Sequence, residues 1–184
     1  MVGVILCGGK SQRMGEKKEY LKFPDSTLAD YQASRMKVDF ERLYFSSKES
    51  VLNSYNIPTI FDNSEVYAPI FGLCSCIDSI NYDIFVLAID TPFFVSFCKL
   101  MDSFYITKRP TFAKSNFKIH PLIGIYTKDS IDLIKKNIRE KNYKLQTLLE
   151  AINADFVEVD SKETQNLNYK EDYKEALKIV DKLI

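Results

Sequence analysis

One segment near the start of the chain, residues 8–18, has the composition of a phosphate-binding loop. Three glycines punctuate it, Gly8, Gly9 and Gly15, and four of the nine residues from 10 to 18 are basic. Glycine lets backbone N–H groups approach a polyphosphate closely. Arg13 can bind phosphate oxygens through two parallel hydrogen bonds, and Lys18 supplies a compact positive charge. On composition alone, a solvated surface turn explains the segment equally well.

Several other kinds of site are disfavoured by residue order. Neither Gly-x-x-x-x-Gly-Lys-Ser/Thr nor Gly-x-Gly-x-x-Gly occurs, so the segment is neither a Walker loop nor a dinucleotide fingerprint. Cys74 and Cys76 are two residues apart, but no second pair or histidine cluster accompanies them. A zinc site is therefore not expected, and the cysteines are interpreted as buried thiols in a reducing cytosol.

A second candidate for chemistry is Asp90, which follows the most apolar run of the chain, residues 84–89. A carboxylate at a strand end can hold Mg²⁺, a cation that prefers oxygen ligands and triphosphate oxygens. Its alternative role is to cap a helix or form a turn before Thr91 and Pro92.

Apolar periodicity predicts alternating strands and helices. Strands are expected at residues 2–7, 42–46, 57–61, 84–89, 118–126 and 156–159. Helices are expected at residues 27–38, 70–80, 93–104, 129–139, 143–152 and 169–184, with Pro69 in the first turn of the second. This alternation indicates one domain, residues 1–184, with an α/β fold: a three-layer α/β/α sandwich around a mostly parallel, Rossmann-like sheet. Ligands of such sheets bind beyond the carboxyl ends of strands, so the glycine-rich segment and Asp90 should share one rim.

The composition of the chain argues against nucleic acid and membranes as binding partners. Lys+Arg and Asp+Glu number 25 each, so no overall basic field attracts nucleic acid. The chain lacks an apolar run of about 18 residues that could span a membrane, and its start lacks the pattern of a signal peptide. We therefore expect a cytoplasmic protein that binds neither nucleic acid nor membrane.

The order of residues 6–21 resembles a long signature of the GT-A-type nucleotidyltransferases, Leu-Ala-Gly-Gly-x-Ser-x-Arg-Met-Gly-x-Asp-Lys-x-x-Leu. Within this group it is most similar to the molybdenum cofactor guanylyltransferase family. The matching residues are Leu6, Gly8, Gly9, Ser11, Arg13, Met14, Gly15, Lys18 and Leu21. Cys7 stands at the family's alanine and Lys17 at its aspartate. Lys18 keeps the family's spacing from Gly15 and to Leu21, so it is preferred to Lys17 as the catalytic lysine.

The resemblance extends to the donor site. Asp90-Thr91-Pro92 matches the family's metal-binding Asp-x-Pro, and Asp62 matches an aspartate of the nucleotide site. Lys48 takes the place of an asparagine that helps hold the base in the family. The resemblance thus implies a catalytic set of Arg13, Lys18 and Asp90, with Mg²⁺ on Asp90. The nucleotide-binding set that it implies is Leu6, Cys7, Gly8, Gly9, Lys18, Lys48, Asp62 and Asp90.

Weaker matches concern the acceptor. His120-Pro121-Leu122 resembles a His/Glu-Pro-Leu segment on the family's acceptor side, and Asn166 and Asn168 resemble its Asn-x-Asn ending. A structural hydrogen bond for His120 is the alternative, as is a helix N-cap for the asparagines.

The implied reaction transfers GMP from GTP to the phosphate of molybdopterin cofactor and releases pyrophosphate. The family also implies contacts with cofactor-synthesis proteins and acceptor molybdoenzymes. Two alternatives stay open. One is the same chemistry with CTP or another triphosphate, and with the same cofactor or a sugar phosphate as acceptor. The other is a catalytically degenerate nucleotide-binding protein, because the chain departs from the family pattern at Lys17, Lys48, Ala68 and residues 169–170.

Overall fold

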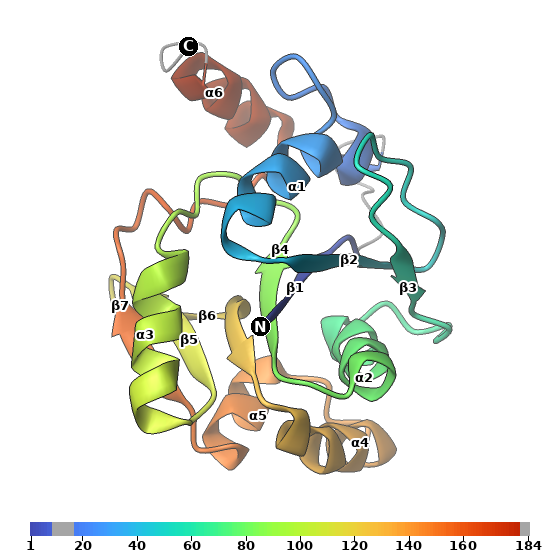
Figure 1. Ribbon diagram of the computed structural model, residues 1–184, viewed down its shortest axis with the longest axis vertical. Coiled ribbons are helices and arrows are strands. Elements are labelled where there is room, and N and C mark those ends of the chain that lie inside the picture. The colour runs from blue at the N-terminus through green and yellow to red at the C-terminus, as the bar shows by residue number, and fades with distance from the viewer. Residues whose placement is uncertain (9–16, 181–184) are drawn as a thin grey trace.

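The computed structural model of the protein describes residues 1–8 and 17–180. Within these ranges, a seven-stranded sheet runs in the order β3-β2-β1-β4-β6-β5-β7 (Figure 1). Its strands are β1 (Val2–Leu6), β2 (Arg42–Ser47), β3 (Thr59–Phe61), β4 (Ile84–Ala88), β5 (Thr111–Ser115), β6 (Lys118–Tyr126) and β7 (Asp155–Glu158). Four of the six strand pairings are parallel, whereas β6 pairs antiparallel with both β4 and β5. The predicted mostly parallel sheet is confirmed.

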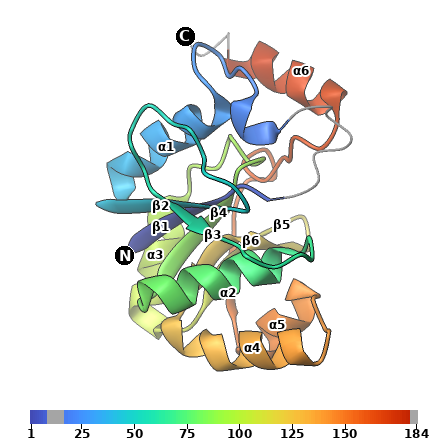
Figure 2. The same cartoon turned by 90° about the vertical axis from the view of Figure 1, so that its right-hand side faces the viewer.

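Helices cover both faces of the sheet, as the sandwich prediction requires. They are α1 (Leu28–Asp39), α2 (Pro69–Ile80), α3 (Phe97–Thr107), α4 (Ile131–Arg139), α5 (Leu145–Ala151) and α6 (Lys170–Val180), with short 3₁₀ turns η1 (Lys18–Tyr20) and η2 (Lys128–Ser130). Helices α1, α3 and α6 pack into the apolar cluster on one face, and α2, α4 and α5 into the cluster on the other. Figure 2 shows α2, α4 and α5 together below the sheet.

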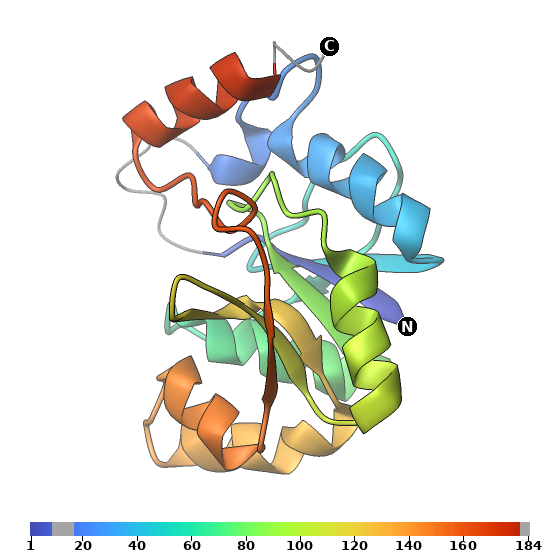
Figure 3. The same cartoon turned by 90° about the vertical axis from the view of Figure 1, so that its left-hand side faces the viewer.

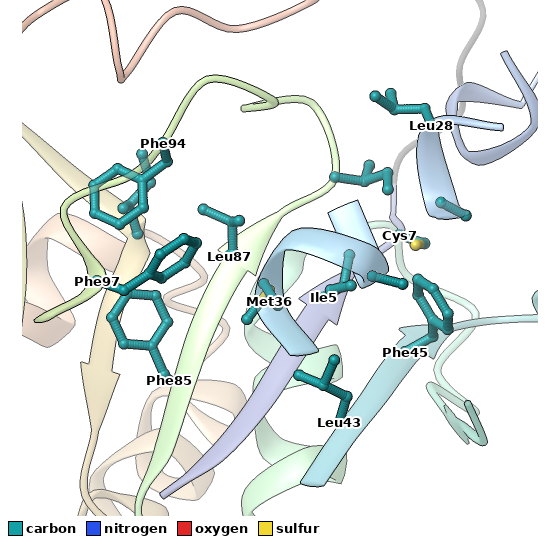
Figure 4. Packing of buried hydrophobic residues seen from close by; sticks show 14 of the residues in the cluster. Ile5, Cys7, Leu28, Met36, Leu43, Phe45, Phe85, Leu87, Phe94 and Phe97 are labelled. Carbon is teal, nitrogen blue, oxygen red and sulfur yellow. The ribbon is translucent and has the colours of Figure 1, made fainter. Parts of the chain in front are cut away.

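The two central strands explain why the core has two halves. Every residue of β1 and β4 is buried. Because side chains alternate along a strand, Ile5, Phe85 and Leu87 enter the cluster with α1 and α3 (Figure 4). Their neighbours Val4 and Val86 enter the cluster on the α2 face. Continuous apolar runs of this kind are typical of parallel strands covered on both faces.

The structure differs from the sequence prediction at two elements. Strand β5 was not predicted, since its short sequence TFAKS carries a lysine and a serine and no clear alternation. Helix α3 begins at Phe97 rather than at residue 93. The carboxylate of Glu163 accepts hydrogen bonds from the backbone N–H groups of Val95 and Ser96, at 3.0 and 2.8 Å. This acceptor comes from a distant part of the chain, so local sequence could not place the start of the helix.

Helix α1 holds the loop that follows β4. The buried Gln32 amide donates to the carbonyl of Thr91 at 3.0 Å. The guanidinium of Arg35 donates to the carbonyls of Pro92 and Phe94. Within the loop, the Thr91 hydroxyl donates to the carbonyl of Ala88 at 2.8 Å. The loop therefore has a fixed backbone path.

No helix within the described part of the chain is long and apolar enough to cross a membrane.

We expect the substitution Gly124→Ala to lower the free energy of unfolding by about 1–3 kcal/mol, because an added Cβ would overpack β6 against β5. That atom would lie 2.4 Å from the carbonyl oxygen of Thr111 and 2.7 Å from Cα of Phe112. Both neighbours are backbone and cannot rotate away. Urea unfolding measures the loss. Gly8→Ala is the matched control, since no atom of residues 1–8 or 17–180 lies within 4 Å of its added Cβ. Equal stability of the two variants would contradict the packing argument.

Replacing Gln32 with leucine should loosen the loop after β4. The change keeps the volume but leaves the buried carbonyl of Thr91 without its donor, at a cost of about 1–3 kcal/mol. Urea unfolding should show this loss, and amide hydrogen exchange should rise across residues 88–94. Val38→Ala serves as control, since Val38 lies on the same helix and is 84% exposed. Unchanged exchange in the loop would show that α1 does not hold it.

Candidate functional site

A cavity of about 260 Å³ lies where the central parallel strands end. Its walls come from the carboxyl ends of β1, β2 and β4, the turn η1, the connection after β3 and the first turns of α2. Strands β1 and β4 are paired in parallel with Leu6 opposite Ala88, so the residues after them face one space. The predicted shared rim of the glycine-rich segment and Asp90 is thus present at Gly8 and Asp90.

Lys18 and Asp90 form an ion pair inside this cavity. The ammonium of Lys18 lies 2.6 Å from Oδ2 of Asp90, and the two side chains are only 15% and 17% exposed. Restricted access to water makes such a pair electrostatically stronger than one on the open surface. The neighbouring Lys17 instead pairs with Glu49 at 2.6 Å, with both side chains well exposed. Of the two lysines, the structure therefore brings Lys18 to Asp90, the aspartate for which the resemblance implies a metal-binding role.

The C-terminal segment contacts both members of the Lys18–Asp90 ion pair. The backbone N–H of Leu167 donates to the carbonyl of Asp90 at 2.8 Å, and Leu167 is buried. Oδ1 of Asn168 lies 3.4 Å from the Lys18 ammonium. The backbone N–H of Asn168 donates to Asp172 at 2.9 Å, which fixes the segment to the first turn of α6. Asn168 therefore lies beside the ion pair, although its side chain, like that of Asn166, is exposed.

The residues after β1, Cys7 and Gly8, contribute backbone groups to the site, and neither has a reactive side chain. The N–H of Cys7 donates to the carbonyl of Ser46 at 2.8 Å, which ties the start of the loop to β2. Burial, with smaller contributions from Glu19 and Asp90, raises the pKa of the Cys7 thiol. The thiol therefore stays protonated near neutral pH and is no nucleophile. Gly8 is exposed, and none of the described residues would contact a Cβ added to it. Gly9 and Arg13 lie outside the described residues.

A second ion pair occupies the other end of the cavity. The Lys48 ammonium lies 3.0 Å from Oδ2 of Asp62, whose side chain is 12% exposed. It also donates to the carbonyl of Ser64 and lies 4.9 Å from the ring centroid of Tyr67. Oδ1 of Asp62 accepts from the N–H of Ser64 at 2.9 Å. Both groups are thus held in place where β2 and β3 end. Sequence reasoning missed Tyr67, since an aromatic residue in a loop carries no specific signal.

His120 lies outside the set of residues that line the cavity. Its Nε2 lies 2.8 Å from Oγ of Ser115, which in turn lies 2.8 Å from Oγ1 of Thr164. Burial, and to a smaller extent Lys118, lowers the pKa of His120. The structure gives this residue a neutral hydrogen-bonding role in the sheet. Leu122, two residues later in the same predicted segment, does line the cavity.

The protein groups fit a magnesium ion that arrives with a triphosphate. Among the described residues, no three His, Cys, Asp or Glu side chains gather in a cluster that could hold a metal. Asp90 offers one carboxylate to the cavity, together with open space for a ligand. Mg²⁺ commonly binds through one or two carboxylates and completes its shell with substrate phosphates and water. The donor set therefore suits this ion.

Comparison with known proteins agrees with this geometry. The model of the MobA-like NTP transferase domain matches residues 3–156. A molybdenum cofactor guanylyltransferase of Campylobacter jejuni subsp. doylei is 34% identical over 150 residues, which cover 76% of this chain and 74% of the relative. A probable molybdenum cofactor guanylyltransferase of Aquifex aeolicus is 29% identical over 140 residues, with coverage of 74% and 68%.

A solved structure shows the same fold. Molybdopterin-guanine dinucleotide biosynthesis protein A of Archaeoglobus fulgidus superposes with a TM-score of 0.84, at 20% identity, over 99% of this chain and 100% of that one. The family model covers most of the sheet and the cavity, including Lys18, Lys48 and Asp90. The chain therefore belongs to the MobA-like NTP transferase family and is a nucleotidyltransferase.

Proposed function

We propose that the chain is a molybdenum cofactor guanylyltransferase, which transfers GMP from GTP to the phosphate of molybdopterin cofactor and releases pyrophosphate. The observation that carries the proposal is the Lys18–Asp90 pair, 2.6 Å apart at the end of a cavity, with Asn168 beside it. The names of the relatives from Campylobacter jejuni and Aquifex aeolicus support this choice of donor and acceptor.

The reaction needs positioning and charge stabilisation rather than a covalent intermediate. An oxygen of the acceptor phosphate attacks the α-phosphorus of GTP, while the bond between that phosphorus and the bridging oxygen breaks. Pyrophosphate leaves with the electron pair. The acceptor oxygen is already anionic, so no protein base has to remove a proton. Lys18 would offset the negative charge that gathers on the phosphates in the transition state.

Asp90 would hold the magnesium ion of the bound triphosphate. When bound there, the ion would stabilise negative charge on phosphate oxygens. Lys18 and Asp90 contact each other in the structure, so a triphosphate would compete for the lysine's ammonium and the ion for the carboxylate. Arg13 and the backbone of Gly9 are proposed to bind the same phosphates, on the strength of the family signature.

The base is proposed to lie at the Lys48–Asp62 end. A lysine ammonium only donates hydrogen bonds, and guanine presents two acceptors, O6 and N7, along one edge. Adenine and cytosine carry an amino group where guanine has O6, so they would place a donor against a donor. Asp62 only accepts, which suits the N–H groups of guanine. This charge pattern favours GTP over ATP and CTP.

The substitution Asp90→Ala should reduce turnover by several orders of magnitude, because it removes the proposed metal ligand and the partner of Lys18. Pyrophosphate release from GTP, molybdopterin cofactor and Mg²⁺ measures the rate. Circular dichroism should show an unchanged fold. A wild-type chain that releases no pyrophosphate under these conditions would contradict the proposed function. Near-normal turnover of Asp90→Ala would contradict only the metal assignment.

Lys48→Met should weaken GTP binding roughly tenfold and narrow the preference for GTP over ATP, because it removes the donor proposed to face O6. The KM values for GTP, ATP, CTP and UTP in the same assay provide the measurement. Lys135→Met is the matched control: it removes an equal charge from the exposed pair with Asp78, outside the cavity, and should leave the four KM values within about twofold. If the wild-type chain preferred CTP, or if both variants behaved alike, this base assignment would be wrong.

A further inference from the structure

The hairpin that joins β5 to β6 carries an unusual residue in its turn. Its two central residues, Asn116 and Phe117, have φ values of 47° and 64°. A two-residue turn of this type favours glycine at its second position, because a side chain there is strained by its own backbone. Phe117 nevertheless occupies it. Its side chain is 95% exposed, more than any other large apolar side chain in the described part of the chain.

The contacts of Phe117 within the described residues do not explain why a phenylalanine stands at this position. A large aromatic ring in water contributes little to folding, and a strained backbone lowers stability. The Lys114 ammonium lies 5.9 Å from the centroid of the Phe117 ring. Strained residues of this kind tend to gather at ligand sites, so the turn points to a ligand that covers the ring.

The turn lies on the same side of the molecule as the cavity. Strand β6 is antiparallel to β4, with Ile123 opposite Leu87, so the start of β6 extends beyond the carboxyl end of β4. Leu122 lines the cavity, and Phe117 precedes it by five residues, or about 16 Å along an extended strand. Figures 2 and 3 show the β5–β6 hairpin reaching out on the side where β1 ends.

We propose that Phe117 is a stacking platform for the pterin ring of the acceptor. This inference rests on the proposed function. If the acceptor phosphate reaches Lys18 and Asp90, its flat ring system must lie further out along the rim, in the direction of the hairpin. Stacking on an aromatic side chain is a general way to bind a flat heterocycle. The Lys114 ammonium lies 5.9 Å from the ring centroid, and the rest of the exposed ring is open to a flat ligand.

The substitution Phe117→Gly should weaken cofactor binding without weakening the fold, so it distinguishes a binding role from a structural one. Glycine relieves the strain at φ 64°, so the midpoint of thermal unfolding should stay equal or rise. The KM for molybdopterin cofactor should increase roughly tenfold, the size of effect typical of a lost stacking partner. The KM for GTP should stay within about twofold. Pyrophosphate release at varied cofactor and varied GTP provides both values.

Two further variants serve as controls. Asn116→Gly relieves the strain at the other turn position and keeps the ring, so its KM for the cofactor should equal that of the wild type. Phe117→Trp keeps an aromatic surface and should retain the wild-type KM, whereas Phe117→Leu should resemble the glycine variant.

Three outcomes would overturn the inference. An active wild-type chain with an unchanged cofactor KM in Phe117→Gly would contradict the stacking role alone. A defect seen only when product is passed to an acceptor molybdoenzyme would assign the ring to a protein contact instead. A wild-type chain inactive with GTP and cofactor would contradict the proposed function and remove the basis of the inference.

Discussion

The site depends on one contact, the ion pair between Lys18 and Asp90. The two residues are 72 positions apart and meet because β1 and β4 lie side by side, in parallel and in register. Both side chains are largely withdrawn from water, so either charge left alone would be costly. Contacts from α1 and from the C-terminal segment hold the backbone around Asp90 and so keep the two charges together. Gln32 and Arg35 of α1 fix the loop that carries Asp90, and Leu167 binds the carbonyl of Asp90 itself.

The same arrangement explains how a chain with no net charge can bind a polyanion. Acidic and basic residues are equal in number, so long-range attraction contributes little. At both ends of the cavity, however, a lysine is held against an aspartate by folded structure. Such charges are already oriented before a ligand arrives, so their positions require little reorganisation when phosphate charge develops. The field is therefore local, and the packing of the sheet determines where it acts.

The sequence predicts the parts of the fold that have strong local signals. Strands β1 and β4 are continuous apolar runs, and α2 follows a proline at its first turn. Features that depend on distant contacts were harder to foresee. Strand β5 owes its place to pairing with β6 and β7, and α3 begins where Glu163 binds its backbone. For the site, motif spacing placed Lys18, Lys48, Asp62 and Asp90 around one cavity. The same reasoning left two roles open for His120, and the structure shows the hydrogen-bonding one, to Ser115. The roles of Arg13 and Gly9 remain predictions.

The departures from the family signature have a physical consequence that bears on whether the site is degenerate. Lys17 stands where the signature has an aspartate, and Lys48 where it has an asparagine; each adds a positive charge near the cavity. Each new charge has an acidic partner, Glu49 for Lys17 and Asp62 for Lys48. The exposed pair contributes little to stability, but the part-buried one orders the end of the cavity opposite Lys18. The Lys48 charge is balanced and held in place by Asp62, which is the arrangement expected in a cavity that binds an anionic ligand. These departures therefore support a change in how the base is held rather than a loss of the nucleotide site.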